Sequence, residues 1–220
     1  MSASSVVIIA PIASCNCPKI VSSCQQQSYQ SALSDKLLGW DEAGEWRFKA
    51  FVAERESQDH ELAIAEDLIR FLDSMTDGAI LDASRAAVYH WTSADVWQTR
   101  RVADRHQLPA DQPLRRLPWC DLQQVFLDGP AALPGAWGFG LKEVVNALGA
   151  LDPAWSTHWP ADLDAGAHAM VMAWRAYQTA EPSRSEEIGL IKRYLEADCC
   201  ALRQILGWLR ATRHGGENDG

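Results

Sequence analysis

The sequence lacks a long hydrophobic run, an excess of positive charge, and periodic glycine or proline. Its longest apolar run covers residues 6–13 and contains Pro11, whereas a membrane-spanning helix needs roughly 20 apolar residues. The chain carries 20 Lys and Arg against 29 Asp and Glu, a net charge of −9. This charge argues against binding nucleic acid or anionic lipid through bulk attraction. We therefore expect no membrane partner, and any phosphate must be held by locally placed groups.

Several familiar signatures are also missing. No basic segment precedes the first apolar run, so we expect no secretory signal. The six cysteines then read as reduced thiols, and the expected compartment is the cytoplasm. The sequence holds no G-x-S-x-G elbow, P-loop or dinucleotide fingerprint. What remains is a chain of 220 residues, 47% of them hydrophobic, long enough to bury one sizeable core.

Acidic residues are absent from the beginning of the chain, where Asp35 is the first. Residues 14–34 are rich in Ser, Gln and Cys, and the acidic, patterned sequence begins near residue 40. We divide the chain into a divergent N-terminal strand and polar loop over residues 1–36, a main domain over residues 37–212, and a disordered tail over residues 213–220.

The apolar pattern predicts a mixed α/β fold. β-branched and alternating runs predict strands over residues 5–9, 46–52 and 86–91. Helical periodicity predicts helices packed on the faces of the resulting sheet. The expected helices cover residues 57–75, 93–106, 121–127, 141–148, 163–177 and 185–210.

Two acids stand where a site could form. Tyr194 and Asp198 are four residues apart and project from one helix face, where the carboxylate could hold a cation and the phenol could orient a water. Asp95 lies just after a predicted strand, inside the first turn of the next helix. Each also has a structural alternative. Tyr194 and Asp198 could be a solvated pair on the helix surface, and Asp95 could simply interact with the helix dipole.

The order of several short segments resembles a known family, the YprB-type RNase H-like exonuclease domain. This domain occurs in RecB-like nucleases and is related to the DEDD 3′-to-5′ exonucleases. The resemblance covers about residues 37–210. It rests on residues 44–53, Val88-Tyr89-His90-Trp91 with Asp95, Trp119-Cys120-Asp121-Leu122, residues 138–145, residues 169–174, and Tyr194-Leu195-Glu196-Ala197-Asp198-Cys199 with Trp208-Leu209.

The resemblance implies an RNase H-like mixed sheet flanked by helices and a phosphodiesterase that uses two Mg²⁺ or Mn²⁺ ions. Asp95 and Asp198 match two of the family's metal-binding acids, and Tyr194 matches the residue that positions the attacking water. Lys142 would contact a substrate phosphate, and Trp91 would lie at the substrate. The implied partner is the end of a single-stranded DNA or RNA, with a partner nuclease or helicase domain possible. Asp121 is expected to cap its short helix.

The sequence departs from the family at its first motif, a strand with Asp-x-Glu. The strand-like residues 6–12 hold no acid, and Ala10 and Ile12 stand where the acids belong. Asp35, Asp41 and Glu42 are the nearest acids. Three explanations follow: a divergent enzyme that recruits another acid, an inactive relative that still binds nucleic acid or protein, or a chain altered near its N-terminus.

Two rival interpretations do not need catalysis. The ten tryptophans could form a surface that binds unpaired bases or a partner protein, although such rings more often fill a core. The chain could also be a plain helical protein with no inherited site, which predicts no sheet beneath the helices.

Overall fold

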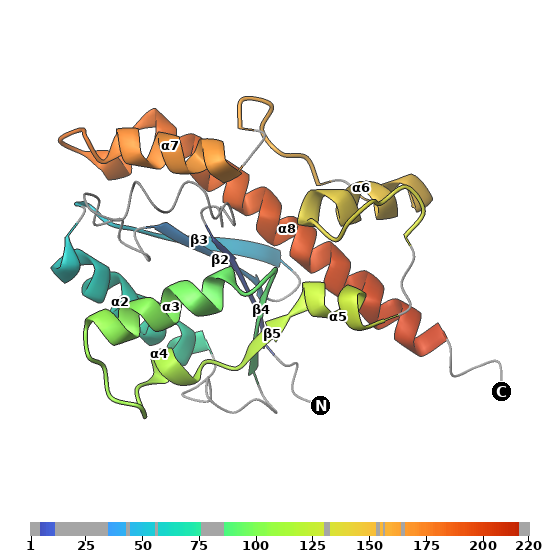
Figure 1. Ribbon diagram of the computed structural model, residues 1–220, viewed down its shortest axis with the longest axis horizontal. Coiled ribbons are helices and arrows are strands. Elements are labelled where there is room, and N and C mark those ends of the chain that lie inside the picture. Colours follow the sequence, from blue (N-terminus) through green and yellow to red (C-terminus); the bar gives the residue numbers. More distant parts are fainter. Residues whose placement is uncertain are drawn as a thin grey trace.

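The computed structural model has a mixed sheet with helices on both faces (Figure 1). It describes residues 5–11, 35–42, 45–55, 57–75, 86–129, 133–152, 155, 157–163 and 166–215. Residues 12–34 and 216–220, on which the predicted polar loop and most of the predicted tail fall, lie outside this part. The predicted α/β class is confirmed, and a plain helical protein without a sheet is excluded.

Five strands form the described sheet, in the order β3-β2-β1-β4-β5. β1 (Ser5–Pro11) lies in the centre, antiparallel to β2 (Asp35–Glu42) and parallel to β4 (Ala86–His90). β3 (Glu45–Val52) pairs antiparallel with β2, and β5 (Trp119–Asp121) pairs parallel with β4. The carboxyl ends of β1 and β4 therefore meet at one edge of the sheet.

Side chains on β2 alternate between two cores, as the pleat of a strand requires. Leu37 faces a core formed with helices α5 to α8, and Leu38 faces a core formed with α2, α3 and α4. The helices are listed here in chain order: α2 (Gln58–Met75), α3 (Ala94–Arg105), α4 (Pro113–Arg116), α5 (Leu122–Asp128), α6 (Leu141–Leu151), α7 (Gly166–Ala176) and α8 (Glu186–Gly215), with a 3₁₀ turn at Pro182–Arg184.

α8 is the longest described helix and runs diagonally through the view of Figure 1, beside the strands. It contacts β1, β2, α6 and α7. Its buried residues include Ile191, Leu195, Leu202 and Ile205, spaced so that they follow one face of the helix. None of the helices in the described ranges combines the length and apolar character needed to cross a bilayer.

Most predicted helices and strands are present, but two strands were not predicted. Residues 36–39 of β2 are all buried, and a strand covered on both faces shows no alternation of polar and apolar residues. β5 has only three residues, too few to show a period. α6 continues to Leu151, past Gly149, where we expected it to stop.

At Gly39, the Trp46 ring and helix α8 both lie close to the backbone of β2. A Cβ atom there would lie 2.5 Å from Cζ2 of Trp46 and 3.2 Å from the Cβ of Cys199 on α8. The Trp46 ring is held in turn, because it packs edge-on against Phe48 and lies under the Arg203 guanidinium. A side chain at position 39 would therefore displace the Trp46 ring and press against Cys199 on α8.

We predict that Gly39→Ala lowers the free energy of unfolding by about 1–3 kcal/mol, the usual cost of overpacking. Urea denaturation followed by circular dichroism measures this change. Gly207→Ala is the matched control, because nothing lies within 4 Å of the added Cβ and removing a glycine from a helix interior stabilises it by about 0.5–1 kcal/mol. Equal effects of the two substitutions would contradict the predicted contact.

Candidate functional site

Asp95 is held at the amino end of α3 by a local turn and by a buried lysine. Thr92 adopts a left-handed backbone conformation (φ 71°) between β4 and α3, and its amide donates a hydrogen bond to Asp121 Oδ1 at 3.2 Å. The Asp95 carboxylate that follows is fully buried. Lys36 Nζ donates to Asp95 Oδ1 at 2.9 Å and to Gln98 Oε1 at 2.8 Å. Among the described residues, Asp95 Oδ2 is buried without a hydrogen-bond partner.

Lys36 reaches Asp95 because of its place in the sheet. On β2 it pairs with Pro11, the last residue of β1, and therefore lies beside the carboxyl ends of β1 and β4. Two residues along β2, Leu38 packs into the core that includes α2 and α3. Side chains two apart on a strand share a face, so Lys36 extends toward the same helices.

Asp198 lies on α8 and is nearly buried, with 8% of its surface exposed. Trp159 Nε1 donates a hydrogen bond to Asp198 Oδ1 at 2.7 Å. Burial is the largest cause that raises the pKa of Asp198 from the ordinary 3.8 to about 7, and the negative charge of Asp95 adds to the rise. The Trp159 hydrogen bond and the positive charge of Lys142 act in the opposite direction. The two acids thus lie near enough to interact, although 103 positions separate them in the sequence.

Lys142 links the first turn of α6 to this part of α8. Its Nζ lies 4.9 Å from the centre of the Tyr194 ring and 5.1 Å from the centre of the Trp159 ring. Both distances are suited to a cation–π interaction. Tyr194 and Asp198 therefore share one helix face, as their spacing predicted, and Lys142 lies on that side.

Trp91 and Asp121 stabilise the fold: Trp91 packs in the core and Asp121 caps α5. Trp91 is 6% exposed, its indole N–H donates to the carbonyl oxygen of Phe139 at 3.1 Å, and its ring packs on Phe126. We expected Trp91 at the substrate, but in the structure this ring is part of the core and is not available for stacking on a base. Asp121 caps α5, as expected, by accepting a hydrogen bond from the Gln123 amide at 2.9 Å.

The residues present do not fit a two-metal site. The Lys36 ammonium already binds the Asp95 carboxylate, and the Trp159 indole binds that of Asp198. Residues 1–34 contain no acid, and within the described ranges no three Asp, Glu, His or Cys side chains gather as possible ligands.

The three acids that we considered as replacements differ in their place in the sheet. Asp41 forms an ion pair with Arg203 near the other end of β2, and Glu42 pairs with Glu45 at the hairpin. Only Asp35 among the three belongs by its backbone to the edge where Asp95 lies, next to Lys36.

Lys36 and Trp159 are site residues that sequence reasoning missed. The signal for Lys36 was weak: a lysine directly before the apolar Leu37-Leu38 pair, in a segment not recognised as a strand. Trp159 lies outside any regular element and gave no signal.

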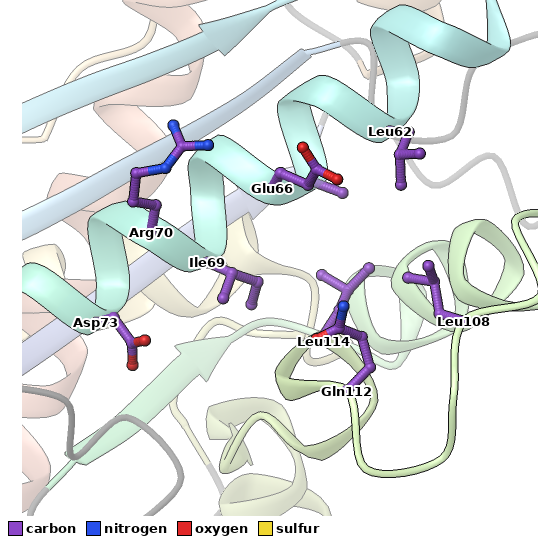
Figure 2. A pocket seen from close by; sticks show the side chains of 9 residues that line it. Leu62, Glu66, Ile69, Arg70, Asp73, Leu108, Gln112 and Leu114 are labelled. Atoms are coloured by element: carbon purple, nitrogen blue, oxygen red, sulfur yellow. The ribbon is translucent and has the colours of Figure 1, made fainter.

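The described surface also has a groove of about 310 Å³ between α2 and the connection from α3 to α4 (Figure 2). Leu62, Ile69, Leu108 and Leu114 line it together with polar residues such as Glu66 and Arg70. None of the site residues contributes to its wall, so the groove is separate from the site around Asp95 and Asp198.

No protein-family model, no curated protein and no solved structure matches this chain.

The raised pKa of Asp198 predicts a pH-dependent stability. The pKa of Asp198 is about 7 in the folded chain, against the ordinary value of 3.8. Between these two pH values the folded chain therefore binds more protons than the unfolded chain. The free energy of unfolding should fall as pH rises from about 4 to about 7 and level off above. The loss is up to roughly 4 kcal/mol.

Urea unfolding at about pH 4.5 and about pH 8, on the two sides of the expected transition, measures this loss of stability. Asp198→Asn should remove it, whereas Asp41→Asn, which removes an exposed carboxylate, should keep it. An unchanged difference between the two pH values in Asp198→Asn would show that another group is responsible.

Proposed function

We propose that this chain is an RNase H-like domain, related to the 3′-to-5′ exonucleases, that binds the end of a single-stranded DNA or RNA in the cytoplasm without cutting it. Its architecture supports the proposal, because helices cover both faces of a mixed sheet. So does the approach of Asp95, on the helix after β4, to Asp198, on the last helix.

The observation that carries the non-cutting part is the engagement of both acids by groups of the protein. Hydrolysis with two metal ions needs several carboxylates whose oxygens are turned toward the ions. Here an ammonium binds Asp95, and an indole N–H binds Asp198. In addition, the central strand β1 (residues 5–11) supplies no carboxylate.

Binding is supported by aromatic and cationic groups around the site. Lys142 lies against the buried Tyr194 ring and the partly exposed Trp159 ring, so a positive charge and one accessible ring meet beside Asp198. Proteins bind single strands by combining phosphate contacts with base stacking on aromatic rings. Such local cations are needed in a chain of net charge −9.

A second candidate is the active exonuclease, a Mg²⁺- or Mn²⁺-dependent enzyme, alone or with a partner nuclease or helicase domain. One observation favours it. Asp95 Oδ2 is buried without a partner among the described residues and lies in the neighbourhood of Asp198, so the site retains an unused carboxylate oxygen.

We predict that the chain binds 5′-labelled single-stranded DNA or RNA in the presence of EDTA, and that Lys142→Ala weakens this binding about fivefold to tenfold, the effect of losing roughly 1 kcal/mol. Fluorescence anisotropy at fixed salt measures the affinity. Lys192→Ala is the control of equal charge. It lies two residues before Tyr194 on α8, about 200° around the helix, and should bind normally.

The same labelled strands, incubated with Mn²⁺ and resolved by length, separate the two candidates. Intact strands with retained binding support a binding domain. Progressive shortening that disappears in Asp198→Ala would establish the exonuclease and contradict the non-cutting proposal. Equal affinity of Lys142→Ala and Lys192→Ala would remove Lys142 from the binding surface.

A further inference from the structure

Lys36 is unusual because a lysine side chain is nearly completely buried at the edge of the sheet where the candidate site lies. Its side chain is 2% exposed, and that of its partner Asp95 is 0% exposed. Removing an ammonium from water is costly, and a buried ion pair often stabilises a fold no better than apolar residues of the same size. Stability alone is therefore a weak explanation for a lysine at this position.

The ammonium contacts two side-chain oxygen atoms of α3. It lies 2.9 Å from a carboxylate oxygen of Asp95 and 2.8 Å from the amide oxygen of Gln98, one turn further along α3. These are the oxygen types that Mg²⁺ and related ions bind. The backbone at Lys36 pairs with Pro11 at the carboxyl end of β1, so the charge sits beside the strand from which further acids would have come.

We propose that the Lys36 ammonium is a built-in cation that takes the position of a metal ion at Asp95, and that this residue closes the site to Mg²⁺ and Mn²⁺. The Lys36 ammonium is paired with Asp95 Oδ1, and it would repel at close range a divalent ion bound to Asp95 Oδ2. The absent acids of β1 and the buried lysine of β2 are then two parts of one change: the site has exchanged a metal for a side chain.

This inference rests on the proposed function only for the choice of the site, and it makes a separate claim. If Lys36 only connects β2 to α3 through its ion pair, its replacement weakens the fold and creates no metal site. If Lys36 stands in for a metal, its removal leaves a buried carboxylate that a divalent ion can neutralise, and a metal site is gained.

The test is Mn²⁺ binding, followed by electron paramagnetic resonance of free Mn²⁺ and by thermal unfolding. Wild-type protein should show no saturable Mn²⁺ binding that depends on Asp198. Lys36→Met keeps an unbranched chain without the charge, and should gain one site with an affinity at least about tenfold higher than wild type. Mn²⁺ should also raise its unfolding temperature. The gain should vanish in the double variant Lys36→Met with Asp95→Asn.

Lys49→Met is the matched control, because Lys49 lies on neighbouring β3 with an exposed side chain and should gain no site. If Lys36→Met does not fold, Lys36→Gln retains a hydrogen-bond donor and serves instead. The proposal is overturned if wild type binds Mn²⁺ and loses it in Asp198→Asn, or if a folded Lys36 variant gains no more than Lys49→Met. Nucleic-acid binding is a separate measurement, so a chain that gains Mn²⁺ on loss of Lys36 yet binds no strand would refute only the proposed function.

Discussion

The ion pair between Lys36 and Asp95 is the contact on which the site depends. It joins β2 to the first turn of α3 across the ends of β1 and β4, over 59 positions of sequence. Removing one member of such a pair leaves an uncompensated buried charge, which typically costs about 3–5 kcal/mol. The amino end of α3, the turn at Thr92 and the Asp121 side chain that binds this turn are consequently fixed relative to the sheet.

A second constraint comes from α8 on the opposite face. Cys199 is fully buried against the Leu37 and Gly39 segment of β2, so its neighbour Asp198 is carried into a place where little water remains. The raised pKa follows from this packing rather than from a special arrangement of charges, since burial is its largest cause. Trp159 and Lys142 offset part of the cost.

Sequence reasoning found the elements that have a clear period and missed those whose identity depends on neighbours. The helix at Gln58–Met75 and the strand at Glu45–Val52 were predicted nearly to the residue, because each has one buried and one exposed face. β2 was missed because burial on both faces erases alternation. The strand predicted over residues 5–9 extends to Pro11, and the central position of β1 in the sheet is set by pairing that no local pattern reveals.

The candidate site divides in the same way. Motif order indicated Asp95, Asp198, Tyr194 and Lys142, and the last three do gather, with Asp95 near enough to affect the Asp198 carboxylate. The sequence could not show that Lys36 and Trp159 would donate hydrogen bonds to the carboxylates of Asp95 and Asp198, because those contacts span 59 and 39 positions. Trp91 was misplaced because an aromatic residue near a site and one in the core look alike in sequence.

If the chain binds a strand as proposed, the charges of the site determine how an acidic protein would hold a phosphate without a metal. Asp95 is neutralised by Lys36, and Asp198, with a pKa of about 7, is about half protonated at neutral pH. Lys142 contributes a positive charge beside the Tyr194 and Trp159 rings. In a metal-dependent nuclease the ions neutralise the acids and attract the phosphate. Under the proposed function, burial and Lys36 would perform the first task and Lys142 the second.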